Sequence, residues 1–152
     1  MNEDLNTDTR SNVESNQYQT IAIEFGKSFT LTNNDIATLL AVEKGWQNKY
    51  RRIMLLGKEL PALPDSIKTD EFLVQGCESN VWLTHAWQGD SNNPTLYLAA
   101  SSDAKIVKGL IAIVLAAFNN KSKQEVAAFD VSAYLQSLML LDELSASRSN
   151  GI

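Results

Sequence analysis

The chain has 152 residues, of which 44% are hydrophobic and 20% are charged, and its formal net charge is −5 at pH 7. These values are typical of a globular protein with one domain that is long enough to bury a core. The acidic balance argues against a nucleic-acid binder, because such proteins usually present a basic face.

The cysteine count excludes several kinds of site. Cys77 is the only cysteine and His85 the only histidine. This chain alone therefore cannot build an intramolecular disulfide, a Cys-x-x-Cys redox pair, a zinc cage of thiolates or the ligand set of an iron–sulfur cluster. A free thiol is typical of a reducing compartment, and we expect no metal site.

The first segment is polar. Residues 1–18 are rich in Asn, Asp, Ser and Thr and lack the apolar core of a secretory signal, so we expect a disordered tail followed by one domain over residues 19–152. The longest apolar run, residues 106–118, contains Lys108 and is shorter than the roughly 20 residues that a membrane span needs. We expect a cytoplasmic protein without a membrane contact.

The segment after the tail predicts an extended arm and two helices. Residues 20–30 have the composition of an arm that docks on the domain. A helix capped by Asn33 or Asn34 follows, since either side chain can accept a hydrogen bond from the first turn. A second helix begins at Trp46 and ends in LGKELPALP, where the two prolines prevent its continuation.

The middle of the chain predicts three strands, at residues 71–75, 81–88 and 95–100. Turn-forming residues separate them, most clearly in GDSNNP at positions 89–94. We expect an antiparallel meander with the strand at 81–88 in the centre and helices on one face. The predicted fold class is therefore α+β, with a small three-stranded antiparallel sheet packed against helices.

The remaining elements are helical. Residues 101–120 are apolar nearly all round, which indicates the buried central helix, with Ser102 or Asp103 near its start. Gly109 costs this helix about 1 kcal/mol relative to alanine, so we expect close packing there. Two shorter helices are predicted at residues 123–128 and 131–140.

Cys77 is placed at an unusual position for a structural thiol. A lone cysteine is most often a small buried hydrophobic residue. Here Gly76 precedes the thiol and the turn-forming run ESN follows it, between two predicted strands. Loop tips concentrate reactive groups, and such a thiol becomes a nucleophilic thiolate where a cation or a helix N-terminus lowers its pKa. The residues around Cys77 agree both with a reactive thiol and with an inert one.

A protease-like pair of Cys77 and His85 is not expected. The two residues are eight positions apart in the chain, which along an extended strand exceeds about 20 Å. A nucleophile and its base must lie within hydrogen-bond reach of each other. We expect His85 on the surface of its strand.

Other charged and aromatic residues have two interpretations each. A cluster of cations on the second helix is either a solvated helix face or a docking surface for an acidic partner; it contains Lys49, Arg51, Arg52 and Lys58. The tryptophans are expected in the core or at its rim; they are Trp46, Trp82 and Trp87. Arg148 is either an ordinary surface residue or a fixed cation close to the thiol.

Four blocks of the sequence resemble the SufE family of sulfur-acceptor proteins, in the order in which the family has them. They are WQNKYRRIMLLGKELPALP from position 46, GCESNVWL from 76, SDAKIVKGL from 102 and LSASRSNG from 144. The resemblance extends over residues 25–151, and the residues of the four blocks are most similar to those of the CsdE branch.

The resemblance implies a function. Members of this family take sulfur from the persulfide of a pyridoxal-phosphate cysteine desulfurase, stimulate that enzyme and carry the sulfur onward. It implies a sulfurtransferase-like carrier in which Cys77 holds a covalent persulfide. The sulfur would go to an iron–sulfur cluster scaffold or to an E1-like tRNA-modifying enzyme. The pyridoxal phosphate belongs to the desulfurase, so no cofactor is expected in this chain, and the implied fold is similar to U-type iron–sulfur scaffolds.

Three further residues match the family blocks next to the implied carrier. Gly76 is expected to give the loop its turn. Arg148 is expected to hold the loop or to stabilise the thiolate, and Asp103 to cap the central helix or to pair with a cation.

The end of the sequence differs from the family, and two rival functions remain to be tested. Family members usually continue past RSNG into another amphipathic helix, whereas this chain ends at Ile152. We expect either that the sequence is truncated or that the domain manages without this helix, and part of the core is exposed if the helix normally covers apolar surface. A scaffold for iron–sulfur assembly is the first rival, although a single cysteine argues against it. The second is a regulatory binding module with an inert thiol.

Overall fold

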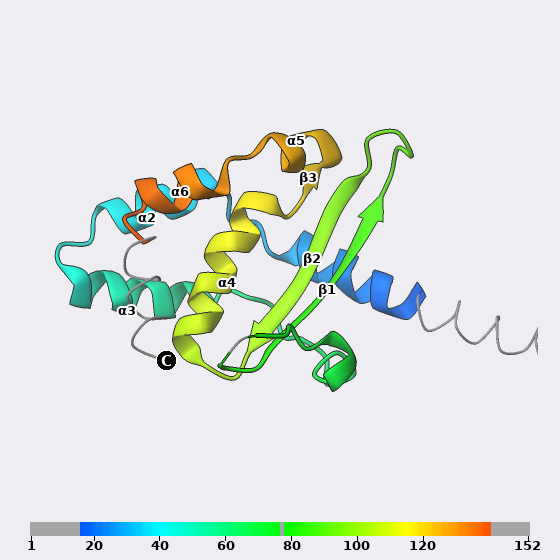
Figure 1. The fold of residues 1–152 in the computed structure, drawn as a ribbon, viewed down its shortest axis with the longest axis horizontal. Helices are drawn as coiled ribbons and strands as arrows, with labels where there is room; N and C mark the ends of the chain where they lie inside the picture. Colours follow the sequence, from blue (N-terminus) through cyan, green and yellow to red (C-terminus); the bar gives the residue numbers. More distant parts are fainter. Residues whose placement is uncertain (1–15, 77, 141–152) are drawn as a thin grey trace, which may run out of the picture.

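The computed structural model describes residues 16–76 and 78–140. The structure has the α+β architecture that the sequence predicts, with helices packed against a three-stranded antiparallel sheet (Figure 1). After a helical segment at residues 16–28, the elements are α2 (Asn33–Ala41), α3 (Trp46–Gly57), the 3-10 helix η1 (Asp70–Phe72), β1 (Val81–Gln88), β2 (Thr95–Ser102), α4 (Lys105–Phe118), β3 (Lys121–Ser122), α5 (Lys123–Ala128) and α6 (Val131–Ser137).

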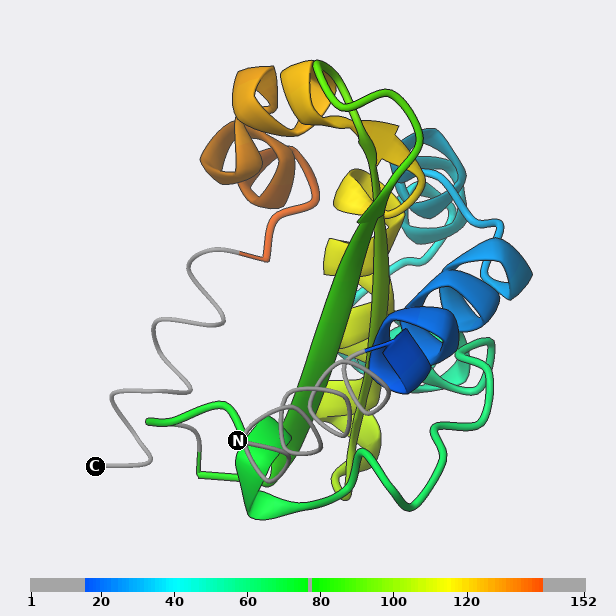
Figure 2. The same cartoon turned by 90° about the vertical axis from the view of Figure 1, so that its right-hand side faces the viewer.

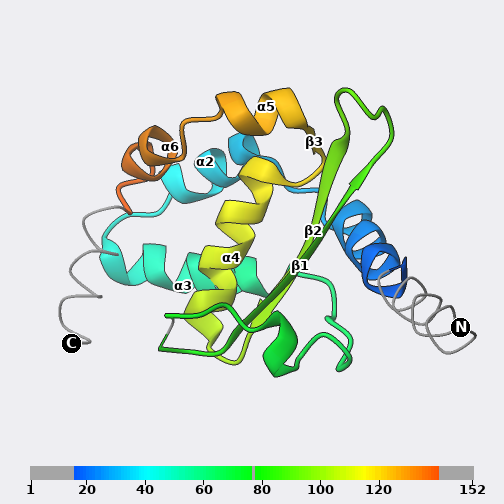
Figure 3. The same ribbon diagram turned by 45° about the vertical axis from the view of Figure 1, so that its right-hand side comes forward.

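The segment at residues 16–28 is a helix, and the prediction of an extended arm over residues 20–30 was wrong. Ala22, Phe25 and Phe29 are all buried, a spacing of three and four residues that lies on one face of a helix. Figure 3 shows this helix, in blue, on the opposite side of the sheet from α4. It also contains residues 16–18, which the sequence assigned to the tail.

A buried asparagine fixes this helix to the sheet. The Nδ2 atom of Asn119 donates to the carbonyl oxygens of Gly26 at 2.8 Å and Phe29 at 3.2 Å. Its Oδ1 atom accepts from the backbone N–H of Leu98, in β2, at 3.1 Å. One side chain therefore satisfies three polar groups of two segments, the first helix with its end and β2, inside the core, where an unpaired group would be costly.

α2 and α3 follow the predicted boundaries closely. Thr32, one residue before the predicted caps, is the N-cap of α2: its Oγ1 accepts from the N–H of Asp35 at 3.2 Å, and the Asp35 carboxylate accepts from the N–H of Thr32 at 2.9 Å. This reciprocal arrangement satisfies two amides that the helix leaves unpaired. α3 begins at Trp46 as predicted and ends at Gly57.

The sheet has the strand order β1-β2-β3, so the predicted centre was wrong. β2 lies in the middle, and β1 pairs with it antiparallel from Val81 opposite Ser102 to Gln88 opposite Thr95. Residues 71–75 do not form the predicted strand, because η1 occupies their first part and only one bridge, Leu73 to Trp82, follows. The third strand is instead β3, which pairs with the far side of β2.

α4 is the central helix and contacts α2, α3 and β2. The close packing expected at Gly109 is confirmed, because a Cβ atom there would lie 2.0 Å from the carbonyl oxygen of Ile53 in α3. The glycine thus lets the two helix backbones approach each other. α5 has the predicted bounds, but α6 ends at Ser137 rather than at 140, because Met139 takes a φ of 59°.

No helix of residues 16–76 and 78–140 combines the length and the apolar character required to cross a membrane.

Candidate functional site

Residues 75, 76 and 78–80 lie in a loop that we call the thiol loop, because Cys77 falls between them in the sequence. The loop starts and ends where the backbone N–H of Val74 donates to the carbonyl oxygen of Val81 at 2.8 Å. Next to this bond, Leu73 and Trp82 form the antiparallel bridge. In Figure 2 the loop extends away from the sheet beside η1. Cys77 itself lies outside the described residues.

The chain on both sides of Cys77 is exposed to solvent. Gln75, Gly76 and Glu78 are all exposed. Gly76 has a φ of 85°, and no atom lies within 4 Å of the place where its Cβ would be. Glycine is therefore favoured here by backbone conformation and not by lack of space. The predicted turn at Gly76 is confirmed.

The end of the thiol loop is fastened to the residues that precede α4. Asn80 donates to the two carboxylate oxygens of Asp103, from its backbone N–H at 3.2 Å and from Nδ2 at 3.0 Å. The carbonyl oxygen of Asn80 in turn accepts from the N–H of Asp103 at 3.3 Å and from Oγ of Ser102 at 2.6 Å. We call these four hydrogen bonds the Asn80 clamp.

The clamp gives Asp103 a role that differs from the two expected ones. α4 has Ala104 as its N-cap, without a hydrogen bond from a side chain to the cap. Within residues 16–76 and 78–140 no cation forms an ion pair with Asp103; the one ion pair there joins Arg52 and Glu43. The carboxylate of Asp103 instead receives both donors of Asn80.

Ser102 connects the clamp to the first turn of α4. Ser102 is buried, and only 4% of its surface is exposed. The hydroxyl donates to Asn80 and accepts from the backbone N–H of Ala104 at 3.2 Å. The predicted position of Ser102 near the helix start is therefore confirmed, and its contact with the thiol loop is an addition.

Sequence reasoning did not single out Asn80 as a site residue. The signal lay in the hairpin register: once Val81 is placed opposite Ser102, residues 80 and 103 follow as neighbours one position further out. Without the register, Asn80 is only one of several turn-forming residues in ESN.

Two other predicted site features have different outcomes. Arg148 lies outside the described residues, so its proximity to the thiol remains a prediction. His85 is exposed on β1, opposite Leu98, which confirms its expected place on the strand surface. No group of three or more His, Cys, Asp or Glu residues suited to a metal ion occurs in residues 16–76 and 78–140.

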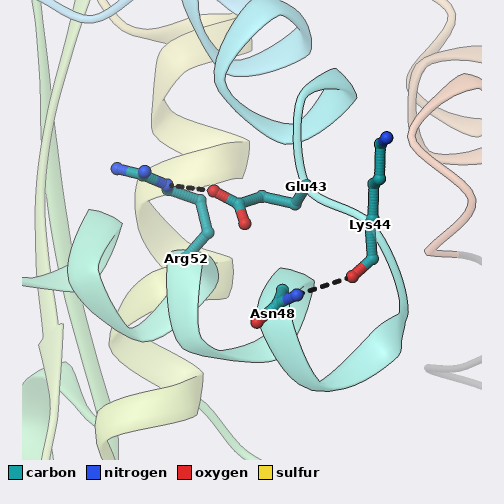
Figure 4. A network of polar contacts seen from close by, with 4 residues as sticks. All are labelled: Glu43, Lys44, Asn48 and Arg52. Atoms are coloured by element: carbon teal, nitrogen blue, oxygen red, sulfur yellow. Dashed lines mark hydrogen bonds and ion pairs between the residues drawn. The ribbon is translucent and has the colours of Figure 1, made fainter.

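The cation cluster of α3 is partly used to hold the fold together. Figure 4 shows the Nε atom of Arg52 pointing at Oε1 of Glu43, 3.1 Å away, and Nδ2 of Asn48 donating to the carbonyl oxygen of Lys44 at 2.8 Å. Lys49 donates to the carbonyl oxygen of Leu138. Arg51 and Lys58 are exposed, as expected for a solvated helix face.

Trp82 lies at the rim of the core, one of the two positions expected, whereas Trp46 and Trp87 lie on the surface. Trp46 is 39% exposed and Trp87 43% exposed, whereas Trp82 is half-buried and packs against the core. Lys49 lies over the ring of Trp46, with its Nζ atom 5.9 Å from the ring centre.

Comparison with known proteins gives a consistent result. Residues 34–152 match the family model described as "SufE: Fe-S metabolism associated domain". An uncharacterized SufE-like protein of Rhizobium etli is 43% identical over 70% of this chain and 72% of its own length. Another from Rhizobium meliloti is 44% identical over 70% of this chain and 76% of its own.

A relative with a functional name also matches. The sulfur acceptor protein CsdE of Escherichia coli is 37% identical over 81% of this chain and 82% of its own length. The family model covers most of the domain, including the thiol loop, the Asn80 clamp and the helices that support them. The chain belongs to the SufE family.

Proposed function

We propose that this chain accepts sulfur from the persulfide of a cysteine desulfurase on the thiol of Cys77. The proposal is supported by membership of the SufE family and by the similarity to a protein named a sulfur acceptor. The structural observation that carries it is the thiol loop, which is exposed on both sides of Cys77 and fastened at both ends.

The reaction is a thiol exchange. The Cys77 thiolate attacks the outer sulfur of the desulfurase persulfide, and a bond forms between that sulfur and Sγ of Cys77. The S–S bond to the desulfurase cysteine breaks, its electron pair stays with that cysteine, and the proton stays on the transferred sulfur. No external oxidant or reductant is needed, because one S–S bond replaces another.

The geometry of the loop suits this exchange. An attacking thiol must reach a sulfur that lies inside another protein's pocket, and a protruding loop can enter such a pocket. The base of the loop is held by the Val74 to Val81 hydrogen bond and by the Asn80 clamp. Holding the base lowers the conformational entropy that the loop loses on insertion.

The absence of a second cysteine protects the product. A neighbouring thiol in the same chain would attack the persulfide, form a disulfide and release the sulfur as sulfide. Because Cys77 is the only cysteine, this chain has no second thiol that could attack the persulfide and release its sulfur.

The proposal also includes the partner of this chain and the destination of the sulfur. The desulfurase supplies pyridoxal phosphate, and this chain works without a cofactor of its own. Removal of sulfur from the desulfurase frees its cysteine for the next turnover, so the desulfurase is stimulated. The sulfur then passes to an iron–sulfur cluster scaffold or to an E1-like tRNA-modifying enzyme. Arg148 stabilises the Cys77 thiolate, as cations near a thiol do.

Mass spectrometry tests the proposal. After incubation with a cysteine desulfurase and L-cysteine, the peptide that contains Cys77 should gain about 32 Da for each sulfur, the mass of the added atom in a thiol exchange. Cys77→Ser is the matched control and should remain folded and unmodified. Sulfur on Cys77→Ser at the wild-type rate would refute the assignment.

Two further measurements address the rival functions. An inert structural thiol would react slowly with iodoacetamide in the native protein, whereas the proposed carrier should react rapidly, with a rate that rises as the thiol deprotonates. An iron–sulfur scaffold would retain iron after reconstitution, whereas we expect none to be retained by this chain alone.

A further inference from the structure

The helix at residues 16–28 lies outside the family model, which begins at residue 34. Membership of the SufE family therefore assigns no role to this helix. Figures 1 and 3 show its first turn, in dark blue, nearer to η1 than its last turn. The first turn is thus placed beside the segment that leads into the thiol loop.

The second half of the helix is fixed to the rest of the domain. Asn119 donates to two carbonyl oxygens at the end of the helix, and Phe25 and Phe29 are buried in the core. The Nζ atom of Lys27 lies 5.9 Å from the ring centre of Tyr97 in β2. These contacts hold the helix in place, and none of them involves its first turn.

The first turn contacts η1 through a pair of aromatic rings. The ring centre of Tyr18 lies 4.7 Å from that of Phe72, and the two ring planes are inclined by 72°. This edge-to-face arrangement is favourable beyond the area that the rings bury. Both side chains are half-buried and pack against the core. Tyr18 therefore restrains Phe72 from a helix that is itself fixed.

Phe72 stands directly before the start of the thiol loop. It is the last residue of η1, and none of the three residues of η1 is fully buried. The next residue, Leu73, forms the bridge to Trp82. The N–H of Val74 then donates to the carbonyl oxygen of Val81, where the loop starts. A contact that holds Phe72 thus also holds the first end of the loop.

We propose that Tyr18 is a positioning residue for sulfur transfer, an inference that rests on the proposed role of Cys77. The ring of Tyr18 holds Phe72, and Phe72 holds the residues at which the thiol loop begins. The Asn80 clamp holds the other end of the loop. Because both ends are held, the loop loses less conformational entropy when it enters a desulfurase.

The role of Tyr18 determines which kinetic constant should change. Tyr18 acts through Phe72 and not on the reacting sulfurs, so its contribution is the same before and during the exchange of sulfur. The loss of such an interaction raises KM and leaves kcat unchanged. The contribution of one edge-to-face ring pair corresponds to a roughly three- to tenfold change in KM.

Kinetics of the full chain test the proposal. The initial rate of sulfur transfer from a cysteine desulfurase is measured at several concentrations of this chain. Tyr18→Ala should raise KM for the chain roughly three- to tenfold, with little change in kcat. Tyr18→Phe keeps the ring and should retain the wild-type KM. Lys27→Ala is the matched control, because it removes a contact between the same helix and β2 and should leave KM unchanged.

Hydrogen exchange tests the contact without sulfur transfer. In Tyr18→Ala the amide of Val74 should exchange faster by a similar factor, whereas Tyr18→Phe and Lys27→Ala should leave its rate unchanged. Phe72→Leu keeps an apolar side chain but removes the ring, so it should have the same effect as Tyr18→Ala. The double variant should add nothing, since both changes remove one interaction. Phe72→Leu also replaces Tyr18→Ala if circular dichroism shows that variant to be unfolded.

Three results would overturn this inference and leave the role of Cys77 intact. They are an unchanged exchange rate of Val74 in both Tyr18→Ala and Phe72→Leu, a wild-type KM in both variants, and a fall in kcat at constant KM. A wild-type chain that accepts no sulfur would instead overturn the proposed function, and this inference with it. The two failures are distinguishable, because only the second one appears in the wild type.

Discussion

Removal of the Asp103 carboxylate should loosen the thiol loop without unfolding the protein. Asp103→Ala deletes the acceptor of the backbone N–H and of the Nδ2 of Asn80, which lie 3.2 and 3.0 Å from the carboxylate. The carbonyl oxygen of Asn80 keeps its bonds to Ser102 and to the backbone of residue 103. The clamp is therefore weakened and not abolished.

The size of the effect follows from exposure. A hydrogen bond contributes about 0.5–1.5 kcal/mol net, and more when one partner is charged. Asn80 and Asp103 are both exposed, so water competes for their groups and the lower end of this range applies to each bond. We expect about 1 kcal/mol of local stability to be lost, which is roughly a fivefold change in the opening equilibrium.

Hydrogen exchange measures this opening directly. The amide of Asn80 should exchange roughly fivefold faster in Asp103→Ala, while the amides of α4 and the melting temperature should change little. Asp103→Asn keeps one acceptor oxygen and should give an intermediate rate. Ala127→Gly, on the exposed surface of α5, is the control for general effects of substitution. An unchanged exchange rate of Asn80 would refute the clamp, and so would a loss of protection throughout α4.

Three other predictions concern the stability of the fold. Gly109→Ala should lower the melting temperature by many degrees, because the new Cβ would lie 2.0 Å from the carbonyl oxygen of Ile53 and overpacking costs about 1–3 kcal/mol or more. A melting temperature within a degree of the wild type would contradict the close crossing of α3 and α4. Burial raises the pKa of Tyr134, so its stabilising contribution is complete below about pH 10 and is lost as the pH rises further. Tyr134→Phe, which also lacks the 3.0 Å hydrogen bond to the carbonyl oxygen of Ile113, should be about 1 kcal/mol less stable at neutral pH and should lose less stability between pH 10 and 12; equal alkaline losses would contradict this. The backbone and hydroxyl of Ser122 lower the pKa of Glu125, so this capping box should stabilise α5 above the ordinary carboxyl pKa and lose its effect as the pH falls through the lowered value. Denaturant unfolding of Ser122→Ala should show less of this acid-side loss than the wild type, and an identical pH profile would contradict the assignment.

Strongly patterned elements could be predicted from the sequence. α3, β1 and α5 have the expected starts and ends, since their turn residues, caps and hydrophobic spacing agree with one another. β3 could not be found in this way, because a strand of two residues has no periodicity. It depends on Asn120, whose φ of 62° turns the chain back and whose N–H donates to the carbonyl oxygen of Leu96 at 2.7 Å.

The first helix shows how two patterns can compete. In TIAIEF apolar and polar residues nearly alternate, which favours a strand. The spacing of Ala22, Phe25 and Phe29 is helical, and tertiary contacts decide between the two, through the burial of these residues and the bonds from Asn119.

The candidate site was predictable in part for the same reason. The turn at Gly76 and the exposure around it follow from local sequence. The contact between Asn80 and Asp103 joins residues 23 positions apart and requires the register of the hairpin. Local patterns thus predict the turn at Gly76 beside the proposed nucleophile, whereas the residues that hold the loop become visible only in the fold.

Transfer of labelled sulfur in a single turnover tests the central claim most directly. A desulfurase is first loaded with ³⁵S-labelled persulfide and freed of cysteine, and then mixed with this chain. We predict that label leaves the desulfurase and appears on Cys77 in equal amount, and that Cys77→Ser leaves the label on the desulfurase. Label that stays on the desulfurase with the wild-type chain, or that moves equally well to Cys77→Ser, would contradict the account.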